Sequence, residues 1–264
     1  MSGSGAAHGS NALILCYHAL SEAWNSPLTV TPQRFRDQMA SLAARGYRSV
    51  GFTDAVQGAG TGRRRVAITF DDACRSVDRL ARPILDEFGF SATVFIPTKY
   101  IGSERPMSWP GIDEYAAGPD AEELVPMSWA ELNRLAEAGW EIGSHTLSHP
   151  DLTKVDDETL ELELVESRSI CEQRLGGRPC TSVAYPYGAV DVRVEAAARS
   201  AGYLAGGALM YAKIPETQLS VRRVGVHQPD APVSFRLKTS PIARRLWRTR
   251  AWAVLELLIR KLRP

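Results

Sequence analysis

The stretch that decides the fold is Val66-Ala67-Ile68-Thr69-Phe70-Asp71-Asp72, an apolar, β-prone run that ends in two adjacent carboxylates. Such a run is typical of a strand that is buried on both faces, as in a parallel sheet covered by helices. Two interpretations of the Asp pair are open. Either the carboxylates end the strand and cap the next helix, or they face a cleft at the carboxyl end of the strand, where α/β folds place their chemistry.

A second polar motif, His145-Thr146-Leu147-Ser148-His149, follows another short apolar segment at 139–144. Two imidazoles four residues apart share one side of a helical turn, although isolated pairs of this kind are also common as surface or structural residues. Taken together, one Asp and both His supply the ligands of a mononuclear divalent metal site. The other Asp is then available as a base.

A third motif, Ala184-Tyr185-Pro186-Tyr187-Gly188, completes a set whose order and approximate spacing resemble the first three motifs of NodB-like polysaccharide deacetylases, also called carbohydrate esterase family 4. The resemblance covers about residues 11–227, and the Ala-Tyr-Pro-Tyr-Gly form is similar to a variant subgroup. It implies an α/β fold, a distorted (β/α) barrel of about seven strands. It also implies a metal-dependent N-deacetylase that acts on N-acetylated sugars.

The resemblance also implies a role for each motif residue. Asp71 is the expected general base, Asp72, His145 and His149 are the expected metal ligands, the backbone N–H of Tyr187 is the expected oxyanion donor, and His227 is the expected general acid. The implied cofactor is a divalent metal ion, with zinc first and nickel, cobalt or manganese as alternatives.

The sequence departs from the family pattern in two places. Ala184 stands where many members carry an Arg that pairs with the base, so Arg222 or Arg223 is expected to set the pKa of Asp71. His227 is followed by Gln228 and Pro229 in place of the usual Leu-His-Asp-like surroundings, and an ordinary exposed loop His is the alternative.

Tyr17-His18 ends the first apolar strand and resembles the opening of the same subgroup. A role in substrate binding or in support of the site is one interpretation, and a His bonded to a neighbouring loop is the other. The irregular segment 101–125 carries Trp109 and Tyr115, which either stack on a sugar or anchor the segment to the body.

Length and composition favour one domain. The 264 residues are 44% hydrophobic, enough for one substantial core at 11–235 after a flexible leader at 1–10. The four cysteines show no CxxC or metal-ligand spacing and are expected to be free thiols in a reducing compartment. The first residues contain neither a basic nor an apolar signal region, so a cytoplasmic location is expected.

The C-terminal segment 236–264 has nine Lys/Arg and one acidic residue, whereas the rest of the chain has 22 basic and 29 acidic residues. Its apolar residues recur at helical spacing, which predicts a basic amphipathic helix. This helix suits the inner surface of an anionic membrane, and packing on the barrel or on a partner subunit is the alternative. No recognition motif supports nucleic-acid binding.

The sequence therefore predicts a metal-dependent hydrolase that removes N-acetyl groups from a sugar or glycan, with a lipid-linked sugar at the cytoplasmic membrane face as one substrate. Two alternatives remain open. The same fold hydrolyses non-sugar C–N bonds, or the chain is a catalytically silent glycan-binding module.

Overall fold

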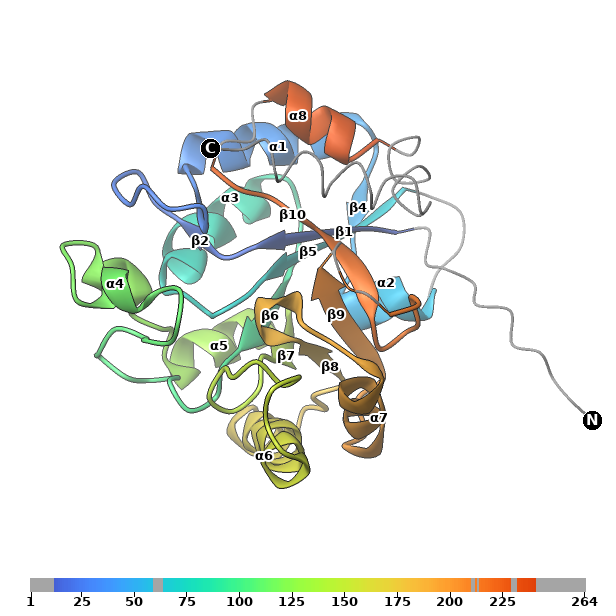
Figure 1. Cartoon of the computed structure of the whole chain (residues 1–264). Coiled ribbons are helices and arrows are strands. Elements are labelled where there is room, and N and C mark those ends of the chain that lie inside the picture. Colours follow the sequence, from blue (N-terminus) through green and yellow to red (C-terminus); the bar gives the residue numbers. More distant parts are fainter. Residues whose placement is uncertain (1–11, 59–63, 210–211, 213, 229–231, 241–264) are drawn as a thin grey trace, which may run out of the picture. The chain divides into compact units, whose positions relative to one another are not determined.

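The computed structural model describes residues 12–58, 64–209, 212, 214–228 and 232–240. Seven parallel strands pair in a closed ring and confirm the predicted (β/α) barrel (Figure 1). Every pairing in the ring is parallel, and the apolar run at 66–70 lies between two neighbours, as its burial on both faces requires. In ring order the strands are β1 (Leu13–Tyr17), β5 (Arg65–Phe70), β6 (Thr93–Ile96), β7 (Glu141–Ser144), β8 (Ser182–Ala184), β9 (Ala205–Leu209) and β10 (Val221–Gly225).

Helices follow most of the strands, and their ends are set by caps that the sequence encodes. Helix α1 (Pro32–Ala44) begins after Thr31, whose side chain accepts a hydrogen bond from the Arg34 N–H, and Pro32 occupies its first position. Asp191 likewise caps α7 (Val192–Ser200), because its carboxylate accepts a hydrogen bond from the Val194 N–H at 2.8 Å. The other helical segments of this unit are α2 (Phe52–Gln57), a π-helical turn (Val77–Ala81), α3 (Arg82–Glu87), α4 (Asp113–Ala116), a 3-10 turn (Ala121–Leu124), α5 (Trp129–Glu137), α6 (Asp157–Arg174), a 3-10 turn (Pro186–Gly188) and α7 (Val192–Ser200).

Three short strands lie outside the ring. Strand β4 (Arg48–Ser49) pairs with the start of β5, and β2 (Ala19–Leu20) pairs with β3 (Thr29–Val30) in a separate two-stranded sheet.

The amino ends of the strands enclose an apolar interior that α2 closes. Phe52 of α2 meets Phe95 of β6 edge to face, with ring centroids 5.2 Å apart. The Thr53 N–H donates to the Glu141 carboxylate at 3.0 Å, which ties α2 to β7. Because this end is sealed, polar chemistry is left to the carboxyl ends of the strands. The apolar cluster comprises Ala12, Ile14, Phe52, Ala55, Val56, Ala67, Phe95, Ala184, Ala205 and Val221.

The segment between β6 and α5 is held by a second apolar cluster. Trp109 is 7% exposed and packs there, and Tyr115 lies edge to face with Trp24 at 5.3 Å. These contacts favour the anchoring interpretation of Trp109 and Tyr115 over sugar stacking.

The chain divides into two compact units, residues 1–228 and 229–264. Helix α8 (Pro232–Lys238) belongs to the second unit. The leader at 1–10 and residues 241–264 of the predicted amphipathic helix lie outside the described residues. Among the helices that the structure describes, none combines the length and the apolar character needed to cross a bilayer.

Candidate active site

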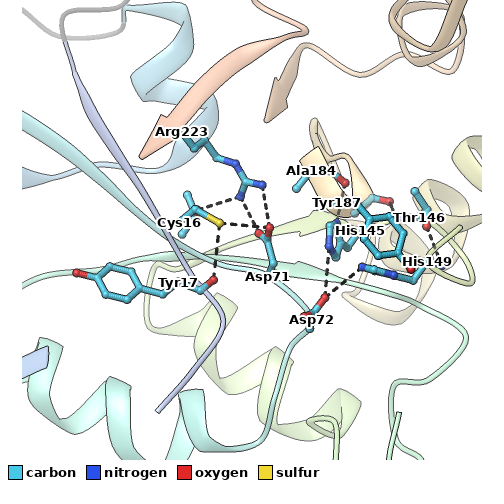
Figure 2. Close-up of polar contacts among 12 residues, drawn as sticks. Cys16, Tyr17, Asp71, Asp72, His145, Thr146, His149, Ala184, Tyr187 and Arg223 are labelled. Carbon is cyan, nitrogen blue, oxygen red and sulfur yellow. Dashed lines mark hydrogen bonds and ion pairs between the residues drawn. The ribbon is translucent and has the colours of Figure 1, made fainter. Parts of the chain in front are cut away.

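Two adjacent carboxylates lie where β5 ends, and the backbone turns them toward different partners. The Asp71 N–H continues the ladder to the Tyr17 carbonyl at 2.9 Å. Asp72 and Ala73 then adopt left-handed conformations, with φ of 69° and 57°. Such a conformation costs a non-glycine residue about 1–2 kcal/mol, so this sharp turn is maintained by its surroundings. As Figure 2 shows, Asp71 points to Arg223 and Asp72 points to the two histidines.

Asp72, His145 and His149 form a compact cluster of buried ligand atoms. Asp72 Oδ1 lies 3.4 Å from His145 Nε2 and 3.5 Å from His149 Nε2. Two ligand atoms that bind one tetrahedral zinc ion at about 2.1 Å are about 3.4 Å apart. Asp72 Oδ1 is buried and accepts no hydrogen bond, which is costly unless a cation satisfies it. The three residues therefore fit a divalent metal ion.

The two histidines differ in protonation: His149 is neutral, whereas the negative charge around His145 favours a bound proton, which a bound cation would replace. Burial, together with the nearby His145, lowers the pKa of His149 to about 3, so its ring is neutral and able to act as a ligand. Burial opposes the cation of His145, but the carboxylates of Asp71 and Asp72 outweigh it and raise its pKa. His145 Nδ1 donates to the Ala184 carbonyl at 2.7 Å, which fixes the ring and directs Nε2 at Asp72.

His149 is oriented by aromatic packing. Its ring stacks on Trp109 with centroids 4.0 Å apart, and Tyr187 meets it edge to face at 4.9 Å. The Tyr187 hydroxyl donates to the Pro110 carbonyl at 3.1 Å, so the segment between β6 and α5 forms one wall of the site.

A buried carboxylate from α6 holds the loop between the two histidines. One oxygen of Glu163 accepts the backbone N–H of Leu147 at 2.9 Å and of Ser148 at 2.8 Å, and the other accepts the Ser148 hydroxyl. The loop needs such support because Thr146 and His149 have φ of 69° and 65°, conformations that a β-branched Thr in particular avoids. No sequence motif marks Glu163, since it lies in the middle of α6 among other acidic residues.

Asp71 is paired with Arg223 of β10, within the barrel. The guanidinium donates to Asp71 Oδ1 at 2.7 Å and to Oδ2 at 2.8 Å, and Arg223 is fully buried. Burial alone would raise the pKa of Asp71, but Arg223 outweighs it and holds that pKa well below its usual range. Arg222 points elsewhere and donates to the carbonyls of Ala212 and Ile214. Of the two arginines expected to set this pKa, Arg223 is therefore the one that contacts the base.

Cys16 of β1 completes the surroundings of Asp71, and sequence reasoning missed it. Its thiol donates to Asp71 Oδ2 at 3.4 Å, and burial raises the pKa of this thiol well above its usual value. Alternate residues of a strand face the same side, so Cys16 faces the barrel interior together with Ile14. This alternation was the signal in the sequence that could have identified Cys16. All four cysteines are free and buried.

Two further histidines, His18 and His227, follow the neighbouring strands β1 and β10. His18 offers a ring nitrogen within 4.8 Å of Cys16 Sγ and of an Asp71 oxygen. His227 folds back over Gly225, and its Nδ1 donates to the Pro27 carbonyl at 3.0 Å.

The predicted oxyanion donor also belongs to the site. Tyr187 lies in the turn after β8 with φ of 59°, next to His149. The structure thus places Asp71, Asp72, His145, His149 and Tyr187 at one end of the barrel.

Known proteins share both the sequence pattern and the fold. The sequence profile of the family described as "Polysaccharide deacetylase" matches residues 58–206, more than half of the chain. The "Putative polysaccharide deacetylase YxkH" of Bacillus subtilis (strain 168) is 26% identical over 197 residues, which cover 73% of this chain and 62% of that protein. The chain therefore spans less than two thirds of this curated relative.

Two solved structures share the fold. The polysaccharide deacetylase BC0361 from Bacillus cereus superposes with a TM-score of 0.71 at 22% identity, over 87% of this chain and 69% of that one. The Streptococcus pyogenes deacetylase PplD, solved in complex with acetate, gives a TM-score of 0.70 at 20% identity, over 87% and 98% of the two chains. The family profile, the motifs at the strand ends and the shared barrel lead to one conclusion: the chain belongs to the polysaccharide deacetylase family.

Proposed function

We propose that this protein is a metal-dependent hydrolase that removes the acetyl group from an N-acetylated sugar or glycan. The observation that carries the proposal is the geometry around Asp72: a buried carboxylate oxygen that accepts no hydrogen bond lies 3.4 and 3.5 Å from two imidazole nitrogens. Family membership supports the acyl-transfer chemistry, and the names of BC0361 and PplD describe deacetylases.

Asp72, His145 and His149 would hold the cation. One carboxylate and two imidazoles suit zinc first, with nickel, cobalt or manganese as alternatives. When bound, the cation supplies Lewis acidity, which makes a water molecule acidic near neutral pH and polarises an amide carbonyl.

Asp71 is the proposed general base. Because Arg223 lowers its pKa, Asp71 stays ionised throughout the neutral range and is able to take a proton from the attacking water. The guanidinium also fixes both carboxylate oxygens, so the base does not need to reorganise during the reaction. The Tyr187 backbone N–H, at the mouth beside His149, is the proposed donor to the oxyanion.

His18 is the proposed general acid, which protonates the departing amine. Its ring places a nitrogen within 4.8 Å of an Asp71 oxygen, whereas His227 Nδ1 bonds to the β2–β3 connection. His18→Gln should lower kcat by about 10²- to 10⁴-fold with little change in KM, and His227→Gln should not. The opposite result would restore the acid role predicted for His227.

The catalytically silent alternative loses one of its two supports. It rested on the missing Arg at Ala184 and on the irregular surroundings of His227, and Arg223 supplies the missing guanidinium from another strand. The proposal of a lipid-linked substrate at a membrane surface rests only on the basic composition of residues 236–264.

The test is acetate release from N-acetylated amino-sugar oligomers and from non-sugar acetamides, with metal content measured on the same samples. Asp72→Ala should lose both metal and activity, and Asp71→Asn should keep the metal while activity falls by about 10²-fold or more. Asp86→Asn, an exposed carboxylate on α3, is the matched control and should behave as wild type. Full activity in metal-loaded Asp71→Asn would show that another group is the base, and turnover of acetamides alone would favour the non-sugar alternative.

A further inference from the structure

A second group of ligand atoms lies beside the candidate metal site. Cys16 and His18 at the end of β1 and Asp71 at the end of β5 each place one ligand atom within 4.8 Å of the other two. Cys16 Sγ is 3.4 Å from Asp71 Oδ2. His18 Nδ1 is buried and has no hydrogen-bond partner. A thiol, an imidazole with an orphan nitrogen and a carboxylate therefore converge at one point.

We propose that Cys16, His18 and Asp71 form a second, inhibitory metal site that selects thiophilic cations such as Zn²⁺ and Cd²⁺. A thiolate and an imidazole are ligands that such ions prefer, whereas Mg²⁺ and Mn²⁺ prefer oxygen. A tetrahedral zinc ion at about 2.3 Å from sulfur and about 2.1 Å from oxygen separates these two atoms by about 3.6 Å, close to the observed distance.

The cation takes the place of the thiol proton. In the structure this proton lies between Cys16 Sγ and Asp71 Oδ2. On binding, the thiol releases its proton to water, the thiolate and Oδ2 bind the cation, and a small ring movement brings in His18. Asp71 Oδ1 keeps its bond to Arg223. Oδ2 also accepts the guanidinium, at 2.8 Å, and binds the cation with the lone pair that accepted the thiol proton, since a carboxylate oxygen accepts more than one partner.

Electrostatic repulsion determines the order in which the two metal sites fill. Arg223 is next to Asp71, and a cation held by Asp72 and the histidines adds further positive charge nearby, so the second site should fill after the first. A cation in the second site would bind both the proposed base, Asp71, and the proposed acid, His18, so that neither could transfer a proton. The inhibitory effect therefore rests on the proposed function, whereas the binding itself does not.

The test is a Cd²⁺ titration of the metal-free, full-length protein, followed by equilibrium dialysis and by the ultraviolet charge-transfer band of a Cd–thiolate bond. Wild type should bind two equivalents, and the band should grow only with the second. Cys16→Ser should bind one equivalent without the band. Cys74→Ser is the matched control, because this buried thiol lies two residues beyond Asp72, and it should keep both equivalents and the band.

His18→Gln keeps the thiol and should weaken the second equivalent by more than about tenfold, since even the loss of an outer-shell partner weakens metal binding by that factor. Retention of the first equivalent shows that each variant is folded. A single equivalent without a band in wild type, or a band that persists in Cys16→Ser, would overturn the second site. If wild type bound a single equivalent and that equivalent carried the band, the site at Asp72, His145 and His149 would be empty. This result would contradict the proposed function instead. In the activity assay, excess Zn²⁺ should inhibit wild type and leave Cys16→Ser at its own uninhibited rate.

Discussion

The ion pair between Arg223 and Asp71 gives the most demanding prediction. Arg223→Met removes a fully buried guanidinium that makes two bonds of 2.7 and 2.8 Å to Asp71 and a third of 3.1 Å to the Thr69 hydroxyl. Breaking a buried pair leaves an uncompensated charge and costs about 3–5 kcal/mol. This is a large part of the roughly 5–15 kcal/mol by which a typical domain is stable.

The loss should depend on pH, and its sign follows from Asp71. In wild type the pKa of Asp71 is below its value of about 3.9 in the unfolded chain, so its charge contributes stability above that pH, and this contribution is lost only as the pH falls through the folded-state pKa. Without Arg223, burial raises the pKa of Asp71 above 3.9, and the penalty then exists at neutral pH and vanishes in acid. The difference between the two proteins should therefore shrink as the pH falls below the raised pKa of Asp71 in the variant, and the two should converge only as the pH falls further through the low folded-state pKa of Asp71 in wild type.

Urea unfolding at neutral and acid pH measures this difference, and kcat/KM against pH should show an acid limb shifted upward in Arg223→Met. The double variant Asp71→Asn/Arg223→Met should regain most of the lost stability, because neither member of the pair then carries a charge. Arg222→Met is the control, since its guanidinium binds two carbonyls and its effect should not vary over the acid range. A loss below about 1 kcal/mol, or an equal loss in acid and at neutral pH, would refute the reasoning.

The supports of the histidine loop give two further predictions. Glu163→Ala removes the acceptor for two backbone N–H groups and should weaken metal binding by about 10–100-fold in a chelator competition. Glu163→Gln keeps one acceptor oxygen and should lose less affinity. Equal metal affinities of wild type and Glu163→Ala would contradict this prediction. Trp109→Ala should lower the free energy of unfolding by about 3–5 kcal/mol, and Trp109→Phe should keep a ring against His149 and with it most of the metal affinity. Trp109→Ala with unchanged stability and a raised KM for the sugar would instead identify a substrate platform.

Much of the barrel was readable from local patterns. Apolar runs bounded by turns mark the strands, and caps such as Thr31 and Asp191 mark where helices begin. The motif residues are also predictable as a group, because parallel strands of a barrel deliver their carboxyl ends to one mouth. Exact helix types are less predictable: the helical segment after β5 begins with a π-helical turn at Val77–Ala81 before it continues as α3.

The sequence by itself determined the barrel class and the pair of motifs that meet at Asp72, because strand periodicity and strand-end position are local properties. Only the tertiary structure decided which arginine reaches Asp71, that Glu163 supports the histidine loop, and that Cys16 and His18 both lie beside Asp71. These contacts join residues as far apart as Asp71 and Arg223, which lie on different strands. The closure of the ring and the inward alternation of its side chains bring such residues together. A local sequence pattern does not show which residues from distant strands will be in contact.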